Sequence, residues 1–172
     1  MHMSFAKEQS SRVAEIGIRR FQQGDAAAFR RLNEEWITRF FRIEPKEEPM
    51  LADPQSSILD SGGRIFFATA GERCVGCCAL IRIADQEFEV AKMAVEPSYQ
   101  GAGIGRKLLV AAIEEGRKAG AHRLYLETNH VLTPAIRLYE SVGFRHIDPN
   151  RIIPSQYKRA DVYMELFLRK NN

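Results

Sequence analysis

Several features are scarce in this chain of 172 residues, and each absence excludes a class of protein. No apolar run approaches the roughly 20 residues of a membrane-spanning helix, and the N-terminus lacks the apolar core of a signal peptide. The charge excess is small, with 25 basic and 22 acidic side chains giving a net charge of +3. Its basic runs are short, so nothing favours nucleic-acid binding. We therefore expect a cytoplasmic protein with no membrane or nucleic-acid partner.

Cysteine is also scarce, and its three copies lie together at Cys74, Cys77 and Cys78. The spacing of the first two occurs in zinc and redox sites. However, residues 74–83 read as a strand, in which positions three apart point to opposite faces. No second cluster of cysteine or histidine completes a tetrahedral site. We expect small buried thiols, no metal and a reducing compartment.

The most informative stretch is VEPSYQGAGIGRKLL, residues 95–109. It places glycines at 101, 103 and 105 between an apolar strand and a helical pattern. Glycine lets the backbone turn tightly and lets a ligand approach it closely. The start of a helix adds unpaired amides and the positive end of a dipole. Together these features predict a socket for phosphate oxygens.

Three kinds of phosphate loop compete for this stretch. A Walker loop needs Gly-Lys-Ser/Thr, but Gly105 is followed by Arg106 and Lys107. A dinucleotide fingerprint needs its third glycine where Arg106 stands. The failed fingerprints disfavour an enzyme that uses ATP or NAD. The remaining pattern, Gln/Arg-x-x-Gly-x-Gly/Ala, fits residues 100–105.

This loop resembles that of the GCN5-related N-acetyltransferase (GNAT) family. A second stretch, PAIRLYESVGF at residues 134–144, resembles the family's Ala-x-x-x-Tyr-x-x-x-Gly-Phe signature. The resemblance covers roughly residues 65–168. It implies an α+β fold (α/β in some schemes) with a mixed central sheet of about seven strands and about four helices. We expect one such domain over residues 15–172, after a flexible segment at residues 1–14.

The hydrophobic periodicity agrees with that fold. Helices are expected from Asp25 to Pro45, briefly after Asp53-Pro54, from the glycine loop to Gly120, and from Thr133-Pro134 to Gly143. The charged stretch 44–54 and residues 148–160 are expected to be loops, and Gly76 indicates a bulge or a close backbone approach. Strands are expected at residues 15–21, 64–70, 74–83, 87–95, 123–128, 144–147 and 161–168.

The resemblance implies that acetyl-CoA is the cosubstrate. Its pyrophosphate would be held by main-chain amides at Gln100, Gly101, Ala102, Gly103, Ile104, Gly105 and Arg106. Its pantetheine arm would lie along strand 87–95, where that strand splays away near Met93, with Ala94 and Val95 as main-chain partners. Asn129 matches a residue that contacts the arm, although it is equally typical of a loop turn.

Two residues are candidates for proton transfer. Tyr139 matches the family tyrosine that protonates the leaving thiolate, and its alternative role is that of a core tyrosine. Glu89 resembles a glutamate that acts as base through water. Glu127 on the next strand is a rival, Glu87 shares the strand of Glu89, and a chain of water molecules could replace all three.

The resemblance implies that the acceptor is a primary amine of a small molecule, an amino acid or a peptide. The segment 25–63 would shape its pocket, with Trp36, Phe40 and Phe41 either in the core or on an apolar wall. In the loop 148–160, Tyr157 could line the pocket, whereas Lys158 and Arg159 read as surface cations. The last strands offer an edge for a homodimer. The alternative function is a CoA-binding sensor without turnover.

Overall fold

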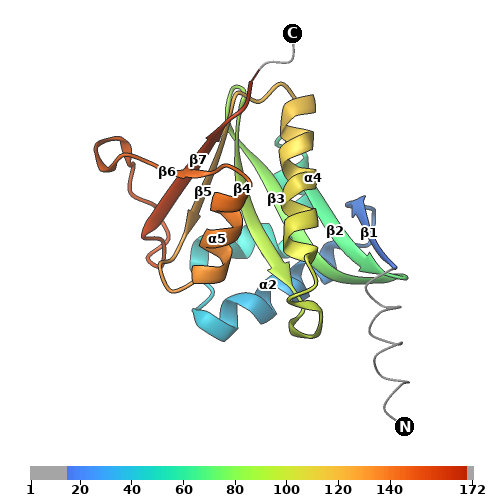
Figure 1. The fold of residues 1–172 in the computed structure, drawn as a ribbon. Coiled ribbons are helices and arrows are strands. Elements are labelled where there is room, and N and C mark those ends of the chain that lie inside the picture. The colour runs from blue at the N-terminus through green and yellow to red at the C-terminus, as the bar shows by residue number, and fades with distance from the viewer. Residues whose placement is uncertain (1–14, 170–172) are drawn as a thin grey trace.

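The computed structural model describes residues 15–169, which form one seven-stranded mixed sheet (Figure 1). The strand order across the sheet is β1-β2-β3-β4-β5-β7-β6. The first four strands form an antiparallel meander, β4 and β5 are parallel, and β7 inserts between β5 and β6. The strands are β1 (Ile16–Arg20), β2 (Arg64–Ala70), β3 (Arg73–Ala84), β4 (Glu87–Val95), β5 (Arg123–Thr128), β6 (Arg145–His146) and β7 (Val162–Phe167).

Four α-helices cover the two faces of the sheet: α2 (Ala26–Phe40), α3 (Glu48–Ala52), α4 (Ile104–Lys118) and α5 (Thr133–Ser141). Figure 1 shows α4 and α5 on one face and α2 on the other. Short helical turns occur at Pro45–Glu47, Gln55–Leu59, Pro97–Tyr99 and Pro149–Arg151. The α+β arrangement predicted from the sequence is confirmed.

The sheet separates two apolar cores, because alternate residues of a strand face opposite sides. On β3, Cys78 and Leu80 join the core beneath α4 and α5. Their neighbours Cys77 and Ala79 join the core beneath α2 and α3. All three cysteines are buried and unpaired, as predicted. The buried face predicted for α4 is also confirmed, and its members are Ile104, Leu108, Leu109, Ala112 and Ile113.

The loop predicted at residues 44–54 is wrong, because the chain there is mostly helical. Pro45 and Pro49 stand in the first turns of two short helices, where proline's missing N–H costs no hydrogen bond. The helix expected after Asp53-Pro54 is only the five-residue turn Gln55–Leu59. The expected flexible segment, residues 1–14, lies outside the described residues.

Two expected helix caps also differ in detail. Asp25 stands at the N-cap of α2, but its carboxylate accepts from the Gln22 amide at 2.7 Å and pairs with Arg19 instead. In α5, Leu132 occupies the N-cap position, one residue earlier than expected. Gly76 does mark a close approach, because a Cβ there would lie 3.2 Å from the Ala94 carbonyl oxygen and 3.1 Å from Leu108 Cδ1.

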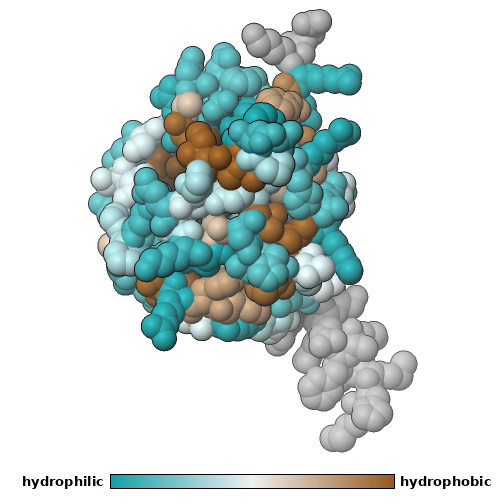
Figure 2. Space-filling model, turned by 90° about the vertical axis from the view of Figure 1, so that its left-hand side faces the viewer, coloured by the Kyte–Doolittle hydropathy of each residue, from teal (hydrophilic) through white to brown (hydrophobic). Residues whose placement is uncertain are grey.

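The side of the molecule on the left of Figure 1 carries the β6–β7 edge. Figure 2 shows that this side is largely hydrophilic, with apolar areas separated by hydrophilic side chains. Phe167 on β7 is 59% exposed. A homodimer through these strands stays a prediction.

Candidate active site

The glycine loop leads directly into the N-terminus of α4. Gly101 and Gly103 have φ values of +80° and +76°, a conformation that favours glycine. Gly103 is the N-cap of α4 and has no side chain with which to cap it. The backbone therefore turns through two left-handed residues and delivers the start of the helix to the surface.

The amides of this loop suit a phosphate group. In the described part of the chain, no amide from residue 101 to residue 106 donates a hydrogen bond to a protein acceptor. A Cβ at Gly101 or Gly103 would meet no atom within 4 Å, so the space in front of the loop is open. Arg106 is exposed beside it and bonds Ser141 Oγ at 2.9 Å. The amide of Gln100 is turned back to the Pro97 oxygen at 3.3 Å, so the free amides begin at Gly101.

Strands β4 and β5 pair over a short distance and then diverge. Only residues 87–89 pair with residues 123–125, although both strands continue beyond this point. Opposite Cys78, β4 carries the two residues Lys92 and Met93, and this bulge places Lys92 at φ +53°. The bulge therefore lies at Met93, but the two strands already diverge after Glu89, four residues earlier than predicted, which leaves Ala94 and Val95 beyond the last pair with β5. The side-chain amide of Gln100 donates to the Val95 oxygen at 3.2 Å.

A cavity of about 180 Å³ opens beside this splay. Its wall brings together Glu89 of β4, Glu127 and Asn129 at the end of β5, and Tyr139 of α5. Glu87 is not part of the wall and lies 3.7 Å from Arg123 in an ion pair. Ala94, Val95 and the glycine loop also lie outside the cavity wall.

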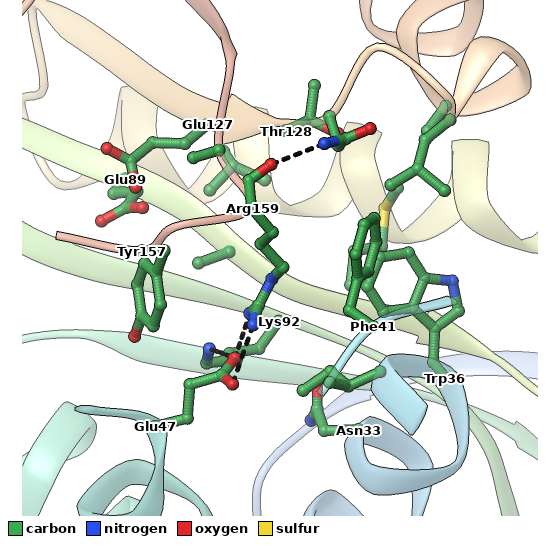
Figure 3. A pocket seen from close by; sticks show the side chains of 18 of the residues that line it. Asn33, Trp36, Phe41, Glu47, Glu89, Lys92, Glu127, Thr128, Tyr157 and Arg159 are labelled. Carbon is green, nitrogen blue, oxygen red and sulfur yellow. Dashed lines mark hydrogen bonds and ion pairs between the residues drawn. The ribbon is translucent and has the colours of Figure 1, made fainter. Parts of the chain in front are cut away.

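Glu89 and Glu127 face the cavity from neighbouring strands (Figure 3). Burial raises the pKa of Glu89 to about 7, and the negative charge of Glu127 adds to the rise. Within residues 15–169, Glu89 makes neither a hydrogen bond nor an ion pair with another side chain. Both oxygens of Glu127 are occupied, by the Tyr125 hydroxyl at 2.8 Å and by Ser155 Oγ at 2.7 Å. Glu89 is thus the carboxylate that is free to accept a proton near neutral pH.

Tyr139 is 9% exposed and packs edge-on against Phe144, with ring centroids 6.1 Å apart. Burial raises the pKa of Tyr139, so its phenol stays protonated at neutral pH. Because Tyr139 also lines the cavity, its two proposed roles are compatible: the ring packs in the core and the residue still reaches the site.

Asn129 lines the cavity, but its side chain already has protein partners. Its Nδ2 donates to the Arg159 carbonyl oxygen at 2.7 Å, and its Oδ1 accepts from the Val131 amide at 3.0 Å. These bonds fix the turn after β5. Contact between Asn129 and a bound arm stays a prediction.

Sequence reasoning missed a cluster of charges on the opposite wall of the cavity. Glu47 is 0% exposed and pairs with both Lys92 and Arg159, whereas the sequence placed it in a charged loop. The surface role preferred for Arg159 is wrong, because its side chain is 18% exposed and lines the cavity. Lys158 is exposed as expected. The one local signal was Glu44, three residues before Glu47, which gives the spacing of a reciprocal helix cap.

Two of the three aromatic residues expected either in the core or on an apolar wall of the pocket do line the cavity. Trp36, Phe41 and Tyr157 line the cavity, and the Trp36 and Phe41 ring centroids are 6.3 Å apart. Phe40 is 49% exposed and is not part of the wall.

Metal sites and membrane spans are both absent from residues 15–169. No group of three His, Cys, Asp or Glu side chains there could hold a metal ion. None of the helices in this part of the chain has the length and apolar character needed to cross a membrane. The thiols offer no nucleophile near neutral pH, since burial raises the pKa of Cys77 to about 12 and raises the pKa of Cys78 as well.

Comparison with known proteins agrees with this geometry. The family model of the Acetyltransferase (GNAT) family matches residues 29–144, and the chain belongs to this family. It is 33% identical over 99 residues to the "Uncharacterized N-acetyltransferase YvbK" of Bacillus subtilis (strain 168). That match covers 56% of this chain and 64% of YvbK, so the chain spans less than two thirds of that relative.

Solved structures show the same fold. A GNAT-family acetyltransferase from Staphylococcus aureus Mu50 has a TM-score of 0.81 at 22% identity, covering 90% of this chain and 99% of that one. The putative acetyltransferase yncA from Salmonella typhimurium, solved with its cofactor acetyl-CoA, has a TM-score of 0.72 at 23% identity. That comparison covers 91% of this chain and 96% of yncA.

Proposed function

We propose that the protein is an acetyl-CoA-dependent N-acetyltransferase that transfers the acetyl group directly to a primary amine. The observation that carries the proposal is the shared cavity of Glu89 and Tyr139. The cavity lies where β4 leaves β5, and β4 leads from there to a loop with free amides. The proposed base and acid therefore share one cavity, and β4 runs from it towards the proposed phosphate socket. Membership of the acetyltransferase family and the acetyl-CoA bound to yncA support this assignment.

Three groups of atoms would hold and polarise acetyl-CoA. The amides at 101–106 and Arg106 would hold the pyrophosphate of acetyl-CoA, and the edge of β4 at Ala94 and Val95 would hold its arm. Such bonds to charged groups contribute about 1.5–3 kcal/mol each. A main-chain N–H from the same edge would polarise the thioester carbonyl as negative charge develops on its oxygen.

Proton transfers accompany the exchange of bonds. The amine nitrogen attacks the carbonyl carbon, the new C–N bond forms and the C–S bond breaks. Glu89, as a carboxylate, receives the proton of the amine directly or through one water molecule. Tyr139 donates its phenolic proton to the departing thiolate. The raised pKa of Tyr139 makes its phenol a weaker acid. The same buried environment also raises the pKa of the departing thiol, so the thiolate becomes a stronger base for this proton.

A cysteine-bound acyl intermediate has no support in this geometry. All three thiols are buried, and none of them lines the cavity. Direct transfer needs no such group, because the donor and the acceptor can meet at Glu89.

The cavity restricts the acceptor to a small amine or to the end of a larger one. It measures about 180 Å³, and its wall combines aromatic rings with charged groups. A small-molecule amine, an amino acid and a peptide N-terminus all satisfy these limits.

The test is release of free CoA thiol from acetyl-CoA in the presence of a broad panel of amines. We expect turnover with at least one panel member, and loss of that turnover in the Tyr139→Phe variant. Binding of CoA without release of thiol across the whole panel would instead favour the sensor function. Failure of CoA to bind at all would contradict both functions.

A further inference from the structure

Glu47 is the most deeply buried carboxylate of the acceptor side of the cavity. It lies between the ammonium of Lys92, at 2.8 Å, and the guanidinium of Arg159, whose Nη1 is 3.0 Å from Oε2 (Figure 3). Although burial raises its pKa, the hydrogen bonds from Arg159 and Lys92 lower the pKa of Glu47 to about 2. The carboxylate is therefore charged throughout the neutral range.

The three residues come from segments that are far apart in the sequence. Lys92 belongs to the bulge of β4, 45 residues from Glu47, and Arg159 belongs to the C-terminal loop, 112 residues from it. A second carboxylate reinforces the link, because Glu44 accepts from the Lys158 amide at 2.9 Å and from Arg159 at 3.3 Å. The pairing thus joins the turn before α3, the bulge and the loop after residue 148.

The same residues support the aromatic wall. The ring of Tyr157 lies under Lys92 and Arg159, with cation-to-centroid distances of 5.0 and 4.9 Å. Arg159 also lies 5.9 Å from the centre of the Phe41 ring, which in turn packs on Trp36. Its carbonyl oxygen holds the side chain of Asn129. Arg159 therefore connects the aromatic wall, through its guanidinium, to the end of β5, through its main-chain carbonyl.

We propose that Glu47, Lys92 and Arg159 form a positioning clasp that fixes the acceptor side of the cavity. The clasp holds the two walls of the cavity at their working separation. It acts through Tyr157, Phe41 and Asn129 and lies apart from the phosphate loop. This inference rests on the proposed function for its effect on turnover, but its structural part can be tested without an acceptor.

The experiment compares Glu47→Gln with Glu165→Gln as a matched control. Glu165 is also buried and pairs with two arginines, Arg123 at 2.9 Å and Arg151 at 2.6 Å, but it does not line the cavity. Lys92→Met is a second variant that removes one cation and leaves Glu47 paired with Arg159. It keeps the proposal testable if Glu47→Gln does not fold.

Trp36 provides a direct readout, because it is the only tryptophan and it lines the cavity. In Glu47→Gln and Lys92→Met we expect stronger acrylamide quenching of its fluorescence. Hydrogen exchange should speed up together at residues 42–52 and 152–160, although these segments are distant in sequence. Affinity for acetyl-CoA, measured by calorimetry, should stay within about threefold of the parent protein, since the phosphate loop is untouched. Glu165→Gln should change neither the quenching nor the exchange of residues 42–52.

With an amine identified by the panel, the clasp variants should raise KM for the amine about tenfold or more while KM for acetyl-CoA is kept. Equal quenching and exchange in the Glu47 and Glu165 variants would overturn the clasp, as would an unchanged KM for the amine. If the parent protein acetylates no amine, the proposed function fails, yet the fluorescence and exchange results still decide whether the clasp exists.

Discussion

Glu127 faces Glu89 across the start of the splay, and its charge adds to burial in raising the pKa of Glu89 to about 7. The two carboxylates have different surroundings. Glu127 accepts two hydroxyl hydrogen bonds, whereas Glu89 accepts none from residues 15–169. This difference supports the proposed role of Glu89 as the base, with Glu127 acting on it through its charge, and it leads to the next three predictions.

Glu89→Gln should lower kcat/KM by about 10²–10⁴-fold, the usual contribution of a general base. In the parent protein kcat/KM should rise with pH through about 7, because only the ionised form of Glu89 accepts a proton. The variant should lose this limb of the profile. Steady-state thiol release between pH 5.5 and 9 measures both effects. A variant with normal rates would leave the water chain as the base.

The same variant should alter the pH dependence of stability. The pKa of Glu89 is raised from 4.5 to about 7 in the folded state, so protonated Glu89 favours folding. This contribution to the free energy of unfolding is fully present below about pH 4.5 and is lost as the pH rises through about 7. The glutamine side chain of the variant does not titrate. The difference in free energy of unfolding, Glu89→Gln minus parent, should therefore become more positive between pH 5 and pH 8. Urea unfolding at the two pH values measures the change.

Glu127→Gln separates the two carboxylates. Removing its charge should lower the pKa of Glu89, so the acidic limb of the kcat/KM profile should move to lower pH. Activity at pH 8 should be largely kept, because the base itself remains. Loss of activity at every pH would instead make Glu127 the base.

Tyr139→Phe removes one oxygen and keeps the ring that packs on Phe144. We expect kcat to fall by about 10²–10⁴-fold, in line with the loss of a general acid. Calorimetry should show near-normal affinity for CoA. Unchanged turnover would remove Tyr139 from the mechanism and leave it as a core residue.

Gly103→Val tests the phosphate socket, with Gly71→Val as its control. Both glycines have positive φ, +76° and +59°, and neither has a neighbour within 4 Å of an added Cβ. Both variants should therefore lose stability by a similar amount, about 1–2 kcal/mol. Only Gly103→Val should weaken CoA binding, because its side chain would stand in front of the free amides. Equal CoA affinity in the two variants would count against the loop as the phosphate site.

Much of this fold could be predicted because its signals are local. Alternating apolar residues located the strands of the meander, and the glycines around Gly103 located the start of α4. Glu89 and Tyr139 could be selected as candidates because each lies at a fixed distance from a recognisable motif. The structure places both residues in the wall of one cavity, while their roles stay predictions.

The clasp could not be predicted, for a physical reason. A charge is buried only when a partner compensates it, and the partners of Glu47 lie 45 and 112 residues away. Sequence reasoning therefore placed Glu47 in a charged loop and Arg159 on the surface. The helical turns around Pro45 and Pro49 were missed because proline and charged residues are typical of loops. The same residue types are also favourable in the first turn of a helix, which is where these two prolines stand.

The short pairing between β4 and β5 divides the sheet into two parts, β1–β4 and β5–β7, which are joined at only one end of these strands. A molecule inserted between the two parts would contact both and would replace the strand contacts that are missing there. Binding of a ligand between the two parts of the sheet should therefore stabilise the whole domain, and the melting temperature should rise as this space between β4 and β5 is occupied. A thermal-shift screen of CoA derivatives and amines, added singly and together, would then reveal an acceptor before any catalytic assay for it exists.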